Sequence, residues 1–373
     1  MHTLTLVTVE LPEIEADSKT DLNIEKEIER LTTESKKKPD NIMLSFSIEQ
    51  LNSLKTAFAR AISSALSDKM DYYAQEPENS DYLEFEDYTE EIKEDYKNKS
   101  VECIKFPDGR IIPAHHEAVR EKYEIIEGKV YEKSDNSDTK YTKPAKDMIL
   151  LPNVPYKEIY KTFKEFAEKE SYYDYNEEHD GYGYMFNPNA FWDWYSIGGR
   201  WPKLFLVKEN CTEVSMGTRT CDTGDEQFKA PEGYKWVCAA RKKDIQWQTM
   251  SEWKKNKASE DFKMFEQWFK DGKCPEDAYV SITDNSIETF GSKLYIKGET
   301  LDENLSRLGI VSKHKYPNLA HAYLADDGYN SADSIWRPDA DDSVITETWR
   351  TMLDNYIDSI PDDTVIVGVD CHM

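Results

Sequence analysis

The chain ends in Asp-Cys-His-Met, three of whose side chains are types that take part in acid–base and nucleophilic catalysis. Residues 363–373 have the Val- and Ile-rich composition of a strand, in which side chains alternate between two faces. This parity puts Cys371 with the valines and leaves Asp370 and His372 together on the opposite face. We interpret Cys371 as a core thiol and Asp370 with His372 as a candidate polar pair. No serine nucleophile can be located beside the pair, so we predict no catalytic residue.

A second group of chemically versatile residues is His115 and His116, which precede Glu117 and are of metal-binding types. The six cysteines are scattered, with no Cys-x-x-Cys pair and no histidine spacing of the zinc-finger type. Such cysteines are typical of reduced, mostly buried thiols. Because the sequence offers no second cluster of ligands for the histidines, we predict no metal site and no cofactor.

Residues 186–205, FNPNAFWDWYSIGGRWPKLF, concentrate aromatic side chains in a turn-rich segment. Trp192 and Trp194 would share one face if the segment is extended, and the glycine pair permits positive φ or a close backbone approach. One interpretation is a turn whose large rings anchor a loop to the sheet. Arg200 lies beside Trp201 and is placed to stack on an indole in that arrangement. The other interpretation is an aromatic binding pocket closed by Arg200 and Asp193. The candidate binding residues are Trp192, Asp193, Trp194, Tyr195, Gly198, Gly199, Arg200 and Trp201.

Two tracts are strongly acidic. Residues 71–95 contain eleven acidic residues, one lysine and four tyrosines, and residues 165–180 contain seven acidic residues and one lysine. They are either an ordinary solvated face or a negative surface that binds a basic groove of another protein, as a nucleic-acid mimic would. On the second interpretation the candidate binding residues are Glu84, Glu86, Glu90 and Glu91.

The first half of the chain is expected to consist of short strands and helices, which position the candidate residues. Residues 2–11 predict a strand, and residues 47–66 predict one amphipathic helix that begins at a capping box of Ser47 with Gln50. Two hairpins are expected to turn at residues 107–109 and 127–128. The polar run at 134–147 is the predicted linker.

The second half repeats the mixture of strands and helices. The expected elements are a helix from Pro155 to about residue 166, a strand in 235–247, a helix at 259–270, a hairpin at 279–290, a short helix capped by Thr300, and a closing strand, turn, helix and strand within 321–373. This order predicts an α+β fold with antiparallel or mixed sheets and a hairpin-rich insertion, and a ferredoxin-like arrangement is compatible with it. We expect two domains, residues 1–147 and 148–373.

The charge balance restricts the class of partner. Lys and Arg number 47 against 73 Asp and Glu, for a formal net charge of -26. We therefore expect no direct binding of nucleic acid and favour basic protein partners. The first residues lack the cationic start of a signal peptide, and no apolar run approaches the roughly 18 residues of a membrane helix. We predict a cytoplasmic protein without a membrane partner.

Three segments carry a resemblance. NPNAFWDWYSIGGRW, YLADDGYNSADSIW and the DCHM ending are similar to an uncharacterised group of proteins encoded by phages and prophages. The resemblance covers the second half well and the first half through the MHTLTLVTVE start. It implies a context, that of a mobile-element accessory protein in a host bacterium, and no activity. The YNSAD that follows the Asp-Gly turn departs from the Trp-His-type sequence of the group, so no shared catalytic histidine is implied there.

Two functional hypotheses follow. The first is a non-enzymatic accessory protein that binds a basic host protein through its acidic surface and inhibits a host nucleic-acid-handling or defence system. The second is a small-molecule or nucleotide-modifying enzyme with a pocket at the WDWYSIGGRW motif.

Overall fold

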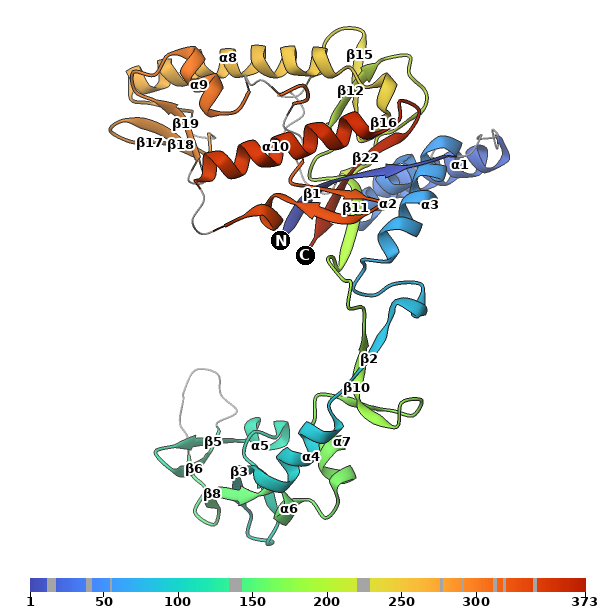
Figure 1. Cartoon of the computed structure of the whole chain (residues 1–373). Coiled ribbons are helices and arrows are strands. Elements are labelled where there is room, and N and C mark those ends of the chain that lie inside the picture. Colours follow the sequence, from blue (N-terminus) through green and yellow to red (C-terminus); the bar gives the residue numbers. More distant parts are fainter. Residues whose placement is uncertain are drawn as a thin grey trace. The chain divides into compact units, whose positions relative to one another are not determined.

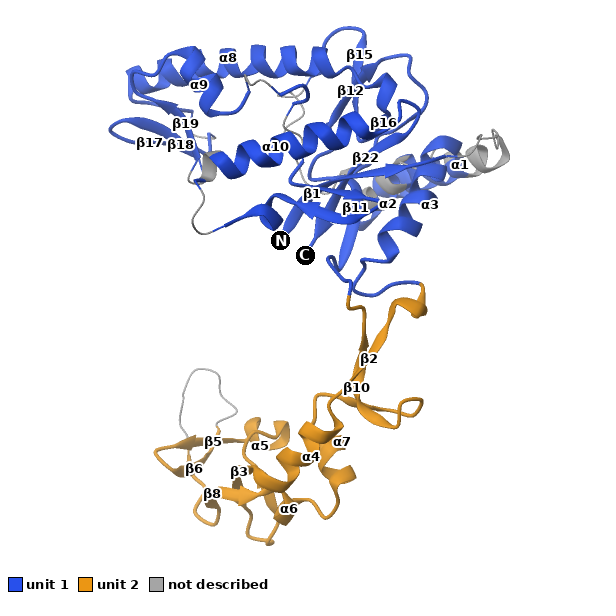
Figure 2. Cartoon of the chain, in the orientation of Figure 1, with its two compact units in different colours: residues 1–78, 189–373 blue, residues 79–188 orange. Residues whose placement is uncertain are grey.

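The structure, a computed structural model, is an α+β protein, as predicted (Figure 1). It describes residues 1–11, 18–37, 42–53, 56–133, 143–219, 229–275, 278–289, 292–310, 314–317, 320–337 and 341–373. These residues form two compact units (Figure 2). Unit 1 comprises Met1–Glu78 and Asn189–Met373, and unit 2 comprises Asn79–Pro188.

This division differs from the predicted one, whose boundary at residues 147 and 148 falls inside unit 2. The reason is strand pairing, because β8 (Ile149–Pro155) pairs with β3 (Ser100–Lys105) and so joins both sides of the predicted linker. Residues 134–142 of that linker lie outside the described residues. Unit 2 is thus a hairpin-containing insertion between two parts of unit 1.

Unit 1 is built around a sheet that has eight strands among the described residues, with the order β13-β16-β22-β1-β20-β21 and with β11 pairing β22 and β14. The strand bounds are β1 (His2–Val9), β11 (Trp194–Gly199), β13 (Val214–Ser215), β14 (Thr218–Arg219), β16 (Ala239–Arg241), β20 (Ala322–Ala325), β21 (Gly328–Ser331) and β22 (Val365–His372). β22 is central, since it pairs antiparallel with β1 along all eight of its residues and with β11 and β16 on its other edge. The two chain ends therefore lie side by side in one sheet.

One face of this sheet packs on α3 (Ala57–Asp71), and α2 (Ile42–Ser53) contacts both β14 and α1 (Ser18–Ser35). The buried residues of this layer are Phe58, Ile62, Leu66 and Met70 of α3, Val7 and Val9 of β1, and Val365, Val367, Val369 and Cys371 of β22. The alternation predicted for β22 is confirmed, and Cys371 belongs to the core with the valines.

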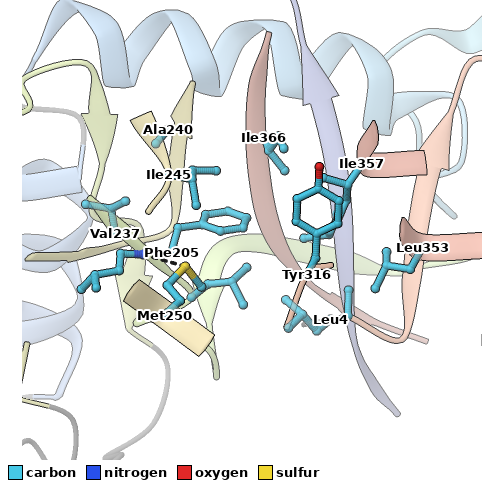
Figure 3. Packing of buried hydrophobic residues seen from close by; sticks show 14 of the residues in the cluster. Leu4, Phe205, Val237, Ala240, Ile245, Met250, Tyr316, Leu353, Ile357 and Ile366 are labelled. Atoms are coloured by element: carbon cyan, nitrogen blue, oxygen red, sulfur yellow. Dashed lines mark hydrogen bonds between the residues drawn. The ribbon is translucent and has the colours of Figure 1, made fainter. Parts of the chain in front are cut away.

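The opposite face packs on α10 (Asp342–Ser359), on the two-stranded sheet of β12 (Phe205–Lys208) and β15 (Tyr234–Val237), and on the start of α8 (Trp247–Asp271). Figure 3 shows the centre of this core, where Leu4 and Ile366 of the sheet face Ile357 and Tyr316. The far half of α8 packs on a smaller sheet and a helix, which are β17 (Ser281–Ile282), β18 (Ser286–Thr289), β19 (Ser292–Ile296) and α9 (Leu301–Arg307). Short 3₁₀ helices cover Lys242–Asp244 and Ala332–Ile335.

The helix predicted at residues 47–66 is two helices, so that prediction was wrong. Ser47 lies inside α2, where its hydroxyl donates to the carbonyl oxygen of Met43 at 2.9 Å. The cap of α3 is Thr56, whose side chain accepts from the backbone N–H of Ala59. The apolar spacing did not reveal the break because it keeps a helical period across it.

Unit 2 contains three small three-stranded sheets, β2-β10-β9, β4-β3-β8 and β5-β6-β7, in its described residues. Its remaining bounds are a 3₁₀ turn (Ser80–Tyr82), β2 (Glu84–Asp87), α4 (Thr89–Asn98), β4 (Ile111–Pro113), α5 (Glu117–Arg120), β5 (Tyr123–Ile126), β6 (Lys129–Glu132), β7 (Lys143–Pro144), α6 (Tyr156–Ile159), α7 (Phe163–Glu170), β9 (Asp174–Asn176) and β10 (Gly181–Phe186). Both predicted hairpins, β3–β4 and β5–β6, are confirmed. The helix predicted from Pro155 is divided into α6 and α7, because Thr162 caps a new helix.

Candidate functional site

The aromatic motif contributes its first tryptophan to the core. Trp192 is 1% exposed, packs among Tyr73, Phe191 and Tyr329, and donates from Nε1 to the carbonyl oxygen of Met70 at 3.2 Å. It therefore does not share a solvent-facing surface with Trp194, which is 40% exposed. The extended segment that the prediction assumed begins only at Trp194, since Trp192 forms an isolated bridge with Ala74.

The glycine pair of the motif is required by close packing. Gly198 and Gly199 have φ of 81° and 54°. A Cβ at Gly199 would lie 2.3 Å from Oδ2 of Asp370, and one at Gly198 would lie 2.6 Å from Sγ of Cys238. This close approach lets the backbone N–H of Arg200 donate to Oδ2 of Asp370 at 2.9 Å. The motif thus wraps a backbone turn around a buried carboxylate.

Asp370 is the centre of this arrangement because it is fully buried yet has no lysine or arginine side chain as a partner among the described residues. Oδ1 of Asp370 lies 2.8 Å from Nδ1 of His2, whose side chain is 15% exposed. A carboxylate that holds one imidazole nitrogen fixes the tautomer and leaves Nε2 available for proton transfer or ligand binding. The geometry is that of an oriented Asp–His dyad.

The second carboxylate–imidazole pair involves His372, which is directly opposite His2 in the sheet. Nδ1 of His372 lies 2.8 Å from Oδ1 of Asp193, and this hydrogen bond lowers the pKa of Asp193. The Trp194 ring stacks on the His372 ring, with centroids 5.4 Å apart and planes inclined by 11°. His2 meets both rings edge-on. Two imidazoles and an indole therefore form one cluster at the end of β1, β11 and β22.

The predicted pair of Asp370 with His372 is corrected by these contacts. Both side chains are on the same face, but each pairs across strands, Asp370 with His2 and His372 with Asp193. In the sheet register His2 is directly opposite His372 and Leu4 is opposite Asp370, so the His2 side chain reaches Asp370 along the diagonal between β1 and β22. The sequence could not supply these partners because they depend on which strands flank β22.

An open pocket of about 680 Å³ adjoins the dyad. It is lined by His2 and Trp201 and by a third pair, His321 with Asp333, whose Nε2 and Oδ2 atoms are 2.8 Å apart. Trp201 packs against the α10-side core. Among the described residues the exposed Arg200 side chain stacks on no aromatic ring, contrary to the expectation for the motif.

Tyr195 points to the α3 side of the sheet, away from the dyad. It packs against the core there, burial raises its pKa, and it lines a second pocket of about 710 Å³ together with Leu31 and Leu66. The aromatic residues of the motif consequently diverge to both faces of the sheet. They do not line a single pocket, so the motif is chiefly a structural element that supports the Asp370–His2 dyad.

Unit 2 brings the two acidic tracts together. β2 comes from the first tract, β9 and the turn after it come from the second, and both strands pair with β10. Residues 81–88 and 172–186, here called the acidic sheet, contain eight acidic residues and seven tyrosines, with no lysine or arginine. The exposed acidic residues are Asp81, Glu84, Asp87, Asp174, Glu177, Glu178 and Asp180.

Tyrosine rings form a stack on the acidic sheet. Tyr88 and Tyr173 are parallel, with centroids 4.1 Å apart, and Tyr184 stacks beside them at 6.1 and 5.9 Å. Glu86 hydrogen-bonds the hydroxyls of Tyr88 and Tyr184, which raises the pKa of both tyrosines. The half-buried Glu86 thus lies beside an aromatic platform whose own segments contain no lysine or arginine, while Lys93 of α4 interacts with Asp87 and Asp180 at its edge.

The other two predicted acidic residues, Glu90 and Glu91, are exposed on the first turn of α4. Negative side chains at a helix N-terminus stabilise the helix by roughly 0.3–1 kcal/mol each. Glu90 also pairs with Lys93 at 2.6 Å. Both glutamates therefore have a local structural role in α4. Glu84 lies in β2 and has neither a helix N-terminus nor a lysine partner among the described residues.

Comparisons with known proteins found no matching family model, no similar curated protein and no similar solved structure. Within the described ranges, no helix has the length and apolar character needed to cross a bilayer.

Proposed function

We propose that the protein acts by binding another protein, and that the acidic sheet of unit 2 binds a basic, nucleic-acid-binding surface of that partner. The observation that carries the proposal is the convergence of two separate acidic tracts on one small sheet that contains no lysine or arginine. Repulsion among these carboxylates is unfavourable for the unit alone and is relieved by a positive partner.

The tyrosine stack supports the same function. Stacked, hydrogen-bonded rings provide rigid contact area that loses little conformational entropy on binding. Tyr184 is 44% exposed and Tyr172 is fully exposed, so aromatic surface is available beside the carboxylates. Alternating negative charge and flat rings reproduces the two features that nucleic-acid-binding grooves recognise, phosphate charge and base stacking. Inhibition of a host nucleic-acid-handling or defence protein, in the phage context that the resemblance implies, is the form of activity that we propose.

The test compares two variants with equal loss of charge. The sheet variant carries Glu84→Gln, Asp174→Asn, Glu177→Gln and Glu178→Gln, and the control variant carries Glu102→Gln, Glu121→Gln, Glu124→Gln and Glu132→Gln, which are exposed elsewhere in unit 2. Each protein is immobilised and used to capture proteins from an extract of the host bacterium, with duplex DNA as competitor. We expect a basic protein that the wild type and the control variant retain, that the sheet variant loses, and that DNA releases. Equal capture by all three proteins would contradict the proposal.

A second candidate function is proton-transfer chemistry on a small molecule at the Asp370–His2 dyad. The observation that favours it is a buried carboxylate that orients His2 at the wall of an open pocket. A thermal-shift screen with nucleotides, followed by analysis of each stabilising compound for conversion, tests this candidate. Conversion that His2→Gln abolishes and His372→Gln retains would support it, and compounds that bind without conversion would exclude it for those compounds.

A further inference from the structure

His115 and His116 have a third potential ligand that the sequence did not indicate. They lie between β4 and α5, while Glu170 is the last residue of α7. Nε2 of His115 is 2.7 Å from Oε2 of Glu170, and Nε2 of His116 is 2.9 Å from Oε1. One ligand atom from each residue lies within 4.8 Å of the others. The fold thus gathers two imidazoles and a carboxylate from positions more than fifty residues apart.

Glu170 lies in an unusual environment for a carboxylate. Its side chain is 4% exposed, and its ion-pair partners among the described residues are the two histidines. The buried Tyr160 hydroxyl donates to Oε1 and lies 3.2 Å from Nε2 of His116. The preceding residue, Lys169, pairs with Glu165 and faces the Tyr160 ring. A buried carboxylate without a permanently cationic partner is normally neutralised or bound to a metal ion.

From this geometry we propose that unit 2 binds one zinc ion through Nε2 of His115, Nε2 of His116 and the carboxylate of Glu170. Two histidines and a glutamate are a ligand set of zinc sites that keep a fourth position open. Zinc–ligand bonds of about 2.0–2.2 Å in a tetrahedral site separate the ligand atoms by about 3.4 Å. The hydrogen-bonded distances of 2.7 and 2.9 Å need to widen by about 0.7 and 0.5 Å to reach this separation.

The surroundings suit this role. The Tyr160 hydroxyl orients the carboxylate, as groups that hydrogen-bond to metal ligands commonly do. The His115 side chain is 49% exposed, so the fourth position is accessible to water or to a side chain of a partner. Cys103 is also buried. Its burial, and to a smaller extent the negative charge of Glu170, raise the pKa of the Cys103 thiol to about 11, which disfavours the thiolate form that binds a metal.

A bound ion would join the β4–α5 connection to the end of α7. The second segment of the acidic sheet begins at residue 172, two residues after Glu170, so the ion would also fix the residues that lead into β9. The zinc proposal does not depend on the partner proposal, because the ion can bind whether or not the acidic sheet has a partner.

Zinc titration of full-length protein made without a histidine tag tests the site, in competition with a chromophoric chelator. We expect one equivalent for the wild type, a loss of affinity of at least about 100-fold for His115→Ala and for His116→Ala, and a loss of roughly 10- to 100-fold for Tyr160→Phe. The matched control is His179→Ala, because His179 is in the same unit and stacks on Phe85 outside the cluster. Its affinity should equal that of the wild type.

Two further measurements separate binding from misfolding. Circular dichroism should show that His115→Ala, which alters a half-exposed side chain, retains the wild-type fold. The spectrum of the Co²⁺-substituted wild type should show tetrahedral d–d bands that Glu170→Gln weakens. Failure of the wild type to bind an equivalent of zinc, or binding that survives when both histidines are replaced, would overturn the proposal.

Discussion

Trp192→Ala is the substitution that most clearly tests the structural role of the aromatic motif. The indole is 1% exposed, so nearly all of its roughly 200 Å² of surface is removed from water. At about 25 cal/mol per Å², the transfer contribution is at most about 5 kcal/mol. Measured Trp→Ala changes in cores are about 3–5 kcal/mol, and we expect a value in that range. That is a large part of the roughly 5–15 kcal/mol that holds a domain folded.

Trp194→Ala is the matched control, because the same side chain is removed two residues away at a position that is 40% exposed. It loses a ring contact with His372, and such pairs contribute about 0.5–1.5 kcal/mol. All nine tryptophans lie in unit 1, so tryptophan fluorescence during denaturant unfolding reports on that unit. A cost of less than about 1 kcal/mol for Trp192→Ala, or one equal to that of Trp194→Ala, would refute the reasoning.

Three other predictions concern the same unit. Cys371→Ser should lower the free energy of unfolding by about 1–3 kcal/mol, because a hydroxyl replaces a buried thiol. Capture of the partner should be unchanged, and lost capture with an unchanged melting temperature would contradict this prediction. Gly199→Ala should destabilise far more than Gly233→Ala, since both have positive φ but only the first would place a Cβ against Asp370, and equal melting temperatures would argue against the close packing. The hydrogen bond from His372 lowers the pKa of Asp193, so this pair contributes stability above the ordinary carboxyl range and loses it as pH falls through the lowered pKa. The stability difference between wild type and Asp193→Asn should therefore shrink in acid, and a pH-independent difference would count against the pair.

Local signals in the sequence predicted many elements correctly. Alternating Val and Ile assigned the faces of β22 and placed Cys371 in the core. Gly109 and Gly128, at positive φ, marked the two hairpin turns, and Thr300 caps its helix as predicted, in a capping box with Glu303. Each of these features is determined by neighbouring residues, which is why the sequence alone was sufficient.

Contacts between distant segments could not be predicted in this way. The partner of Asp370 is His2, 368 residues away, and the third group beside His115 and His116 is Glu170. The two acidic tracts are separate in the sequence, and only the structure shows that β10 pairs with one strand from each tract. Trp192 is not part of the strand that begins at Trp194, because its backbone pairs with Ala74 and Gln75 instead. All of these depend on tertiary topology.

Binding of a basic protein surface by the acidic sheet can be measured through the association rate of the captured partner at rising salt. The Debye length falls from about 30 Å at 0.01 M to about 8 Å at 0.15 M ionic strength, so steered association should slow steeply over this range. We predict that the wild type and the control variant with Gln at 102, 121, 124 and 132 show this slope. The sheet variant should associate more slowly at low salt and show a flatter slope, with an unchanged melting temperature. An association rate that is indifferent both to salt and to the four sheet substitutions would contradict the account.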